Sequence, residues 1–353
     1  MIPAHNEQES IEATIESVLN QTVKPHKIVV IANGCTDATA SIARRYKGIT
    51  VMELPKLPHR KSQALNIAWN EHCKDAFMVV SMDADTCLPP TAIEEWCAEL
   101  SSDPTLGGSS SKFTILNPKG ILPRLQKAEF SAWTDINLQR GSTTVLSGTG
   151  CAIRNKALTT IASRDDREGP WAYTSQVEDF ELTYRIQELG YRTVVSPTVR
   201  AYTDSMKSVK AMWGQRMKWQ VGTLEDLIKI GWNKHTRISW GRQLLSLLGV
   251  VGFLVWIVVF SSIIITYQIK FEPLWLVVPL AVTLHRVHSA FRIPFHDKKD
   301  LFLAASFFPS EAFILFRYLL FVTAWYEIIY SKLTHKKKDR WELQYSSERV
   351  EKL

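Results

Sequence analysis

Two aspartates separated by one residue, Asp83 and Asp85, stand where an apolar, β-rich run at residues 76–82 gives way to a turn. Alternate residues of an extended chain point to the same side, so both carboxylates can face one ligand. Carboxylate oxygens suit hard divalent cations such as Mg²⁺ or Mn²⁺, and a cation held there can neutralise a diphosphate as it leaves. A solvated turn explains the same pair when it is considered alone.

A second acidic pair, Glu178 and Asp179, stands at the predicted start of a helix that ends near Gly190. Ser175 and Glu178 have the spacing of a capping box. Acids in a first helical turn stabilise the helix N-terminus, which is one interpretation of Asp179. The other is chemical, because a carboxylate beside a hydroxyl can take its proton as the hydroxyl attacks.

A third set lies on a predicted helix at residues 205–230. Gln215, Lys218 and Trp219 are spaced i, i+3 and i+4, which places an amide, a cation and an aromatic ring on one face. Such a face can stack a sugar ring and offset the charge of a diphosphate. An amphipathic helix that anchors in a membrane interface through Trp and Lys shows the same pattern.

The elements that must position these residues alternate along the first 200 positions. Periodicity predicts helices at residues 11–19, 62–72 and 90–100, and strands at residues 27–31, 76–82 and 191–196. Alternating helices and strands are typical of an α/β domain with a parallel sheet. In such sheets ligands bind at the carboxyl ends of the strands, where Asp83 is expected.

The composition, 46% hydrophobic and 22% charged over 353 residues, is that of an ordinary globular protein, but it is unevenly distributed. Apolar residues dominate positions 244–330. We therefore predict a cytosolic domain at residues 1–232 that includes an interfacial helix, a membrane region at 233–331 and a basic cytosolic tail at 332–353. No signal peptide precedes the first motif, which favours a cytosolic catalytic domain.

Two membrane spans are expected, at residues 244–267 and 271–291. Residues 301–330 are apolar but interrupted at Pro309-Ser310-Glu311. A single crossing there would place the basic residues 336–338 opposite the soluble domain, against the tendency of cytoplasmic segments to be basic. We therefore interpret this segment as interfacial or re-entrant, with a third span as the alternative.

Charge and cysteine usage exclude some classes of function. Lys and Arg number 42 against 35 Asp and Glu, and clusters at residues 237–242 and 336–340 flank the apolar segments. This placement favours a cytoplasmic membrane face over nucleic-acid binding. The five cysteines show no C-x-x-C spacing, which favours reduced thiols over a zinc site or a disulfide framework.

Seven motifs follow one another in a fixed order along residues 3–219. They are Pro3-Ala4-His5-Asn6-Glu7, Asn33-Gly34-Cys35-Thr36-Asp37, Lys61-Ser62-Gln63-Ala64-Leu65-Asn66, Asp83-x-Asp85, Ser147-Gly148-Thr149-Gly150, Val177-Glu178-Asp179 and Gln215-Arg216-Met217-Lys218-Trp219. This order resembles that of family 2 glycosyltransferases, in particular the membrane-bound processive synthases of cellulose, chitin, hyaluronan and poly-N-acetylglucosamine, and ceramide glucosyltransferase. Beyond residue 219 the resemblance extends only to the membrane architecture.

The resemblance implies a GT-A fold, with a Rossmann-like and mostly parallel sheet, followed by interfacial helices and a C-terminal transmembrane helical region. It implies an inverting, metal-dependent transfer from a nucleotide sugar, expected to be a UDP-sugar, to a growing glycan at the plasma or bacterial inner membrane. One alternative is a single transfer to a lipid acceptor such as a polyprenyl phosphate or a sphingolipid. Another is a catalytically inactive membrane scaffold. Because two or three spans are few for a complete polysaccharide channel, we expect either that the chain forms a homo-oligomer or that its product stays short or lipid-linked.

The resemblance also assigns residue roles. Asp179 is the expected general base, with Glu178 beside it, and Asp83 and Asp85 are the expected metal ligands. The expected donor-binding residues are Pro3, Ala4, Glu7, Asn33, Lys61, Asp83, Asp85 and Lys218. The expected acceptor-binding residues are Gly148, Thr149, Gly150, Gln215, Arg216 and Trp219. Trp341 is the candidate gate over the nucleotide, with a plain surface tail as the alternative.

Three departures from the family pattern bear on these expectations. Lys218 stands where the family has Arg, which exchanges a bidentate fork for a point charge. Asn33 stands where Asp is usual, which weakens the expectation of uridine. The sequence opens at Met1-Ile2 and leaves out most of the first strand, so we expect either that the start is truncated or that the sheet is assembled without this strand. A missing inner strand would leave backbone groups of its neighbours unpaired, a cost that the fold must offset elsewhere.

Overall fold

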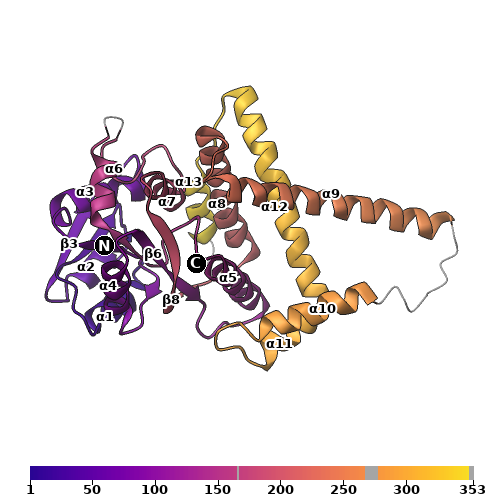
Figure 1. Cartoon of the computed structure of the whole chain (residues 1–353), viewed down its shortest axis with the longest axis horizontal. Helices are drawn as coiled ribbons and strands as arrows, with labels where there is room; N and C mark the ends of the chain where they lie inside the picture. The colour runs from indigo at the N-terminus through magenta and orange to yellow at the C-terminus, as the bar shows by residue number, and fades with distance from the viewer. Residues whose placement is uncertain (165–166, 267–276, 350–353) are drawn as a thin grey trace. The chain divides into compact units, whose positions relative to one another are not determined.

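The computed structural model describes the chain except for residues 165–166, 267–276 and 350–353 (Figure 1). It divides into two compact units. Unit 1 comprises residues 1–117 and 130–205, and unit 2 comprises residues 118–129 and 206–353. The predicted partition at residues 232 and 331 stays a prediction.

Unit 1 contains two β-sheets. In the first, β1 (Ile2–Ala4), β2 (Ile28–Asn33) and β3 (Ile49–Leu54) are parallel and lie in the order β1-β2-β3. The second has the order β4-β7-β6-β8-β5, with β6 and β8 parallel and the other pairs antiparallel. Its strands are β4 (Met78–Ser81), β5 (Thr86–Cys87), β6 (Leu106–Thr114), β7 (Cys151–Arg154) and β8 (Arg192–Thr203). The predicted α/β class is confirmed.

The short strand β1 resolves the question of the first strand. Ile2 pairs with Val30, so the inner edge of β2 has a partner over three residues. The Met82 amide donates to the Met1 carbonyl at 3.2 Å, which joins β1 to the end of β4. Val30, Ile31 and Ala32 of β2 therefore have a strand partner on this side.

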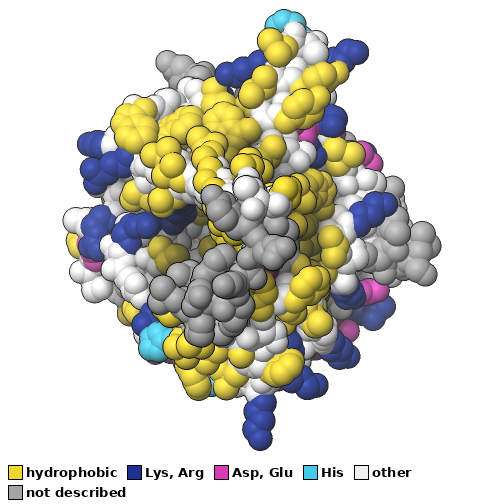
Figure 2. All heavy atoms as spheres, turned by 90° about the vertical axis from the view of Figure 1, so that its right-hand side faces the viewer, with side chains coloured by type: hydrophobic (Ala, Val, Ile, Leu, Met, Phe, Trp, Pro, Cys, Tyr) yellow, Lys and Arg dark blue, Asp and Glu magenta, His cyan; other side chains and the backbone are white. Residues whose placement is uncertain are grey.

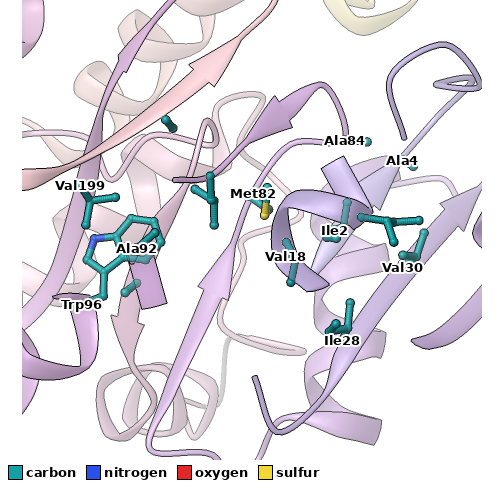
Figure 3. Close-up of a cluster of buried hydrophobic side chains, with 14 of the residues drawn as sticks. Ile2, Ala4, Val18, Ile28, Val30, Met82, Ala84, Ala92, Trp96 and Val199 are labelled. Atoms are coloured by element: carbon teal, nitrogen blue, oxygen red, sulfur yellow. The ribbon is translucent and has the colours of Figure 1, made fainter. Parts of the chain in front are cut away.

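Helices cover these sheets and supply the hydrophobic core of unit 1. They are α1 (Ile11–Leu19), α2 (Thr39–Ala43), α3 (Arg60–His72), α4 (Ala92–Ser102), α6 (Asn155–Ala162) and α7 (Glu178–Glu188), while α5 (Ile121–Arg140) belongs partly to each unit. Figure 3 shows one cluster, in which Ile2 and Val30 lie on the first sheet and Trp96 comes from α4. Burying one large side chain of this kind stabilises the fold by about 1.5–3 kcal/mol. The core holds the ends of β1, β2 and β4 in place.

The start of α7 differs from the prediction. The helix begins at Glu178 with Val177 at the N-cap, and the Ser175 hydroxyl accepts from the Val177 amide at 3.0 Å. The capping box expected from Ser175 and Glu178 is therefore wrong. The reason is electrostatic, because the Glu178 carboxylate lies 3.0 Å from the ammonium of Lys61.

Unit 2 is helical apart from its connecting segments. Its helices are α8 (Val209–Ile230), α9 (Arg237–Thr266), α10 (Val277–Ala290), α11 (Lys298–Ala305), α12 (Phe307–Thr334) and α13 (Arg340–Arg349). A buried cluster joins α8 to α12 through residues such as Leu224 and Ala324, both of which are fully buried.

Among the described residues, two helices are long and apolar enough to cross a membrane. They cover Arg237–Ile263, with a mean hydropathy of 2.6, and Phe307–Thr334, with 1.6. The interruption expected at Pro309 does not break α12, because this proline lies in the first turn, where its missing N–H is not needed. The predicted span at 271–291 falls partly outside the described residues, and its described part is α10. The number of spans stays a prediction.

Candidate active site

A half-buried lysine, Lys61, joins two of the predicted acidic motifs. The Lys61 ammonium donates to Asp83 Oδ1 at 2.7 Å and lies 3.0 Å from Glu178 Oε1. These side chains come from the first turn of α3, the segment after β4 and the first turn of α7. Burial alone would lower the pKa of Lys61, but Asp83 and Glu178 raise that pKa well above its ordinary value. Lys61 is therefore a permanent cation between two carboxylates.

Gly148 lets the backbone pass directly over this ion pair. The Asp83 amide donates to the Gly148 carbonyl at 2.8 Å. A Cβ atom at Gly148 would lie 2.9 Å from Asp83 Oδ2 and 3.1 Å from Lys61 Nζ, closer than ordinary van der Waals contact. The segment of Gly148, Thr149 and Gly150, expected to bind the acceptor, thus lies against Asp83 and Lys61.

Asp179 follows Glu178 in the first turn of α7. Burial and the neighbouring Glu178 charge raise the pKa of Asp179 to about 6, although Lys61 and the Phe180 amide lower it. The Phe180 N–H donates to Asp179 Oδ1 at 2.8 Å, which orients the carboxylate. Asp179 is therefore ionised at neutral pH while holding a proton more tightly than an ordinary aspartate. Those are the properties that a general base needs.

Asp85 lies in a concentration of negative charge. Burial raises the pKa of Asp85 well above its usual range, and the charges of Asp83, Glu7 and Asp204 add to the effect. The Thr86 hydroxyl contributes a hydrogen bond to Asp85 Oδ1 at 3.3 Å. Acids this close to one another oppose each other's ionisation unless a cation is present. The carboxylate oxygens of Asp83 and Asp85 are therefore suited to bind a divalent cation.

The protein's share of such a coordination shell is small. Within the described part of the chain, no three His, Cys, Asp or Glu side chains are grouped so that they could hold a metal ion. Mg²⁺ is commonly bound by one or two carboxylates together with substrate phosphates. Asp83 and Asp85 suit this mode of binding, in which the donor's diphosphate completes the shell.

Asp204 is a residue that the sequence analysis missed. It directly follows β8, and β8 pairs with β5 so that Thr203 stands opposite Thr86. This pairing brings the Asp204 charge close to Asp85. The sequence does show an acid after a predicted strand. Only the pairing of β5 with β8 reveals that Asp204 lies near Asp85.

The carboxyl ends of β1 and β2 lie side by side and carry residues that we expect to bind the donor. His5 Nδ1 lies 2.8 Å from the Asn33 carbonyl oxygen. Asn6 adopts a left-handed backbone conformation with φ of 58°, and its side-chain oxygen accepts from the Thr36 amide at 2.8 Å. The side-chain oxygen of Asn33 accepts from the Leu57 amide at 3.4 Å. Asn33 therefore tethers the loop that follows β3.

The remaining residues of the first motif lie at the end of β1 and in the segment that leads to α1. Pro3 and Ala4 are the last two residues of β1, and Ala4 is buried. The Glu7 carboxylate accepts from the Ser10 hydroxyl at 3.0 Å, and the Glu7 amide donates to Thr39 Oγ1 at 2.8 Å. Glu7 thus belongs to the acidic group around Asp85.

The Gln215 to Trp219 motif lies on α8 in unit 2. Arg216 is 6% exposed and donates to the buried Glu129 carboxylate at 2.9 Å, and it also contacts the Gln215 side chain. Its guanidinium lies 4.3 Å from the centre of the Trp219 ring. Arg216 therefore stabilises unit 2, a role that its predicted place in acceptor binding did not anticipate.

Trp341 contacts Lys218 within unit 2. The Lys218 ammonium lies 3.3 Å from the centre of the Trp341 ring, a cation–π contact. Trp341 lies on α13, which packs on α8 so closely that a Cβ at Gly214 would lie 2.6 Å from Ser347 Oγ. Residues 340–349 are therefore a packed helix rather than a plain surface tail. The predicted gate role of Trp341 stays a prediction.

Comparisons with known proteins identify the family of the chain. The model of a family described as "Glycosyltransferase like family 2" matches residues 1–222. Poly-beta-1,6-N-acetyl-D-glucosamine synthase of Staphylococcus aureus (strain COL) is 24% identical over 235 residues, which cover 65% of this chain and 55% of that protein. The Staphylococcus epidermidis synthase of the same name is 23% identical over 239 residues, covering 66% and 56%. The match thus spans about half the length of these relatives.

A solved structure shows the same fold. The mannosyltransferase PcManGT from Pyrobaculum calidifontis, in complex with GDP-Man and Mn²⁺, superposes with a TM-score of 0.59 at 19% identity. The superposition covers 86% of this chain and 84% of that one. The predicted GT-A fold is therefore confirmed.

Proposed function

The chain is a glycosyltransferase that belongs to family 2, and on that premise we propose that it performs an inverting, metal-dependent transfer of a sugar from a UDP-sugar to a growing glycan at a membrane. The observation that carries this proposal is the group of Lys61, Asp83, Glu178 and Asp179. One ammonium binds the first aspartate of the Asp-x-Asp pair and the glutamate next to the expected base.

Asp179 is the proposed general base. Its carboxylate takes the proton of the acceptor hydroxyl, whose oxygen bonds to the anomeric carbon while the bond from that carbon to the diphosphate oxygen breaks. UDP leaves with the electron pair, and attack from the opposite side inverts the anomeric configuration. The raised pKa of Asp179, about 6, supports the role because a base is most effective when its pKa lies near the working pH.

Asp83 and Asp85 are the proposed ligands of a divalent cation, Mg²⁺ or Mn²⁺. When bound, the cation neutralises charge on the departing diphosphate. Lys61 orients Asp83, because its ammonium donates a hydrogen bond to Oδ1. The acidic surroundings of Asp85 favour a cation over a neutral ligand.

The acceptor and the location are proposed from the relatives and from unit 2. Two relatives are named as synthases of poly-β-1,6-N-acetylglucosamine, so UDP-N-acetylglucosamine is the first donor to test. The two long apolar helices, α9 and α12, support placement in a membrane. The basic segments at residues 237–242 and 336–340 support a cytosolic catalytic unit.

An Asp179→Asn variant tests the proposal. We expect it to lower sugar transfer by at least about 100-fold, because proton removal is lost, while UDP-sugar affinity measured by calorimetry changes little. Glu188→Gln, an exposed acid at the end of the same helix, is the matched control and should transfer normally. Wild-type turnover in Asp179→Asn would refute the assignment of the base.

The length of the product distinguishes the two acceptor classes. Radiolabelled UDP-N-acetylglucosamine and Mn²⁺ should give a ladder of water-soluble products if the acceptor is a growing glycan. A single product that partitions into organic solvent would instead assign the chain to a lipid acceptor. Absence of UDP release with every common UDP-sugar would favour the inactive scaffold.

A further inference from the structure

A cavity of about 550 Å³ lies within unit 2, and none of its lining residues belongs to one of the seven motifs. Its walls come from the segment that leads into α5, from α11 and from the first turn of α12. Three cations, Lys119, Arg124 and Lys299, line it together with apolar side chains that include Ile121 and Phe302. This combination of charge and apolar surface suits an amphiphile with a negative head.

The cations in this region are unequally balanced. Arg124 donates to Asp297 at 2.7 and 2.8 Å and to Asp300 at 2.5 Å, and Lys127 donates to Asp300 at 2.9 Å. Two basic and two acidic groups thus compensate one another. Lys119 and Lys299, which are exposed, add two positive charges to this balanced group, so the cavity carries an excess of positive charge.

The same ion pairs make the cavity rigid. Asp300 and Lys127 are almost completely buried, with side-chain exposures of 2% and 3%, and Lys127 also donates to the Phe295 carbonyl at 2.9 Å. These contacts fasten α11 to the start of α5. A site that exists before its ligand arrives loses little conformational entropy on binding.

The rim of the cavity is strongly apolar and faces outward. Ile121 and Phe302, which line the cavity, are 58% and 76% exposed. Phe307 and Phe308 do not line it but stand in the sequence between the lining residues Ser306 and Pro309, and they are 57% and 81% exposed. Hydrophobic side chains gather on the face of the molecule that Figure 2 shows, with lysines and arginines toward its margin. Exposed apolar surface of this extent marks an interaction site.

The first turn of α12 adds to the attraction for an anion. Ser306 occupies its N-cap, yet the Ser306 hydroxyl donates to the Phe302 carbonyl at 2.8 Å and does not cap α12. Ser306 and Pro309 both line the cavity, so the positive end of a 28-residue helix borders it. This contribution supplements the lysines.

We propose that this cavity binds the phosphate headgroup of an anionic membrane phospholipid, with Lys119 and Lys299 on the phosphate and with Ile121 and Phe302 on the first part of the acyl chains. The proposal rests on the membrane location given under the proposed function, but not on the sugar transferred. A phospholipid is favoured over a soluble anion because the apolar rim would otherwise remain in water. It is favoured over an acidic peptide because the rim adjoins α12, a helix of membrane-spanning length.

The test uses the full chain in detergent and titrates it with short-chain phosphatidylglycerol, with phosphatidylcholine of the same chain length and with inorganic phosphate. We expect phosphatidylglycerol to bind more tightly than either of the others. The double variant Lys119→Gln/Lys299→Gln should weaken phosphatidylglycerol about tenfold or more, because two lysines near the phosphate are lost. Lys207→Gln/Lys298→Gln removes the same charge from exposed positions outside the lining and should bind as the parent does.

Phe302→Ser tests the apolar part of the site, and it should leave the fold intact because this side chain is largely exposed. It should weaken phosphatidylglycerol and leave inorganic phosphate unchanged. Equal weakening by the control double variant would overturn the proposal in favour of diffuse surface charge. Inorganic phosphate that competes as well as phosphatidylglycerol, or phosphatidylcholine that binds equally, would also overturn it. UDP release is measured on the same samples, so failure of the lipid site is distinguishable from failure of the proposed catalysis.

Discussion

Replacing Gly148 with alanine should damage catalysis while leaving the fold largely intact. The new Cβ would lie 2.9 Å from Asp83 Oδ2 and 3.1 Å from Lys61 Nζ, and ordinary contact begins near 3.4 Å. Asp83 must therefore retreat by about 0.5 Å, the difference between 3.4 and 2.9 Å. The backbone of Gly148 lies outside the left-handed region, so alanine adds crowding without backbone strain. Crowding of this size costs about 1–3 kcal/mol of stability.

The expected effect on activity follows from the same displacement. A misplacement of about 1 Å can cost about 100-fold in rate, so a shift of half that size should lower kcat/KM about tenfold. UDP release at varied UDP-sugar concentration measures the effect, and thermal unfolding followed by circular dichroism reports the fold. Gly241→Ala is the control, because nothing lies within 4 Å of its added Cβ. Unchanged kcat/KM in Gly148→Ala, with Gly241→Ala also normal, would refute the placement of the Asp83–Lys61 pair in the reaction.

Three further predictions concern other groups. Because burial raises the pKa of Asp179 to about 6, kcat/KM should fall as the pH drops below about 6. The charged carboxylate also destabilises the fold, so Asp179→Asn should raise the melting temperature at pH 7.5. This gain in melting temperature should shrink towards pH 4, where Asp179 is protonated in the folded protein. Trp341→Leu, which removes the ring in contact with Lys218, should lower kcat/KM about fivefold, whereas Trp341→Phe should lower it less. Equal kcat/KM in the two variants would show that the contact between the ring and Lys218 does not contribute to the reaction. Arg216→Met should destabilise unit 2 by about 3–5 kcal/mol by stranding Glu129, and Arg216→Met/Glu129→Leu should recover most of the loss in detergent melts.

The positions of several helices and strands, the apolar region and the order of the functional motifs could be predicted from the sequence. The helices at residues 11–19 and 62–72 and the strand before Asp83 appear where periodicity predicted them, because these patterns are local. The long apolar helix α9 was likewise evident from its composition. The order of the motifs indicated the family, which the match over residues 1–222 establishes.

The sequence did not predict contacts between residues that are far apart in the chain. The sequence assigned Glu178 to a local cap, but in the fold its carboxylate faces the ammonium of Lys61. Asp204 showed no chemistry in the sequence and reaches Asp85 only through the pairing of β8 with β5. The interruption expected at Pro309 was wrong because this proline lies in the first turn of α12, where its missing N–H is not needed.

The sequence by itself thus determined the alternating helices and strands, the position of Asp83 at a strand end and the apolar character of the second half of the chain. These features depend on residues within a few positions of one another. Only the tertiary structure decided which charges meet, because an ion pair such as Arg216 with Glu129 joins positions far apart in the chain. The partner of a buried charge is set by the packing of whole elements, and local propensity carries no record of that packing.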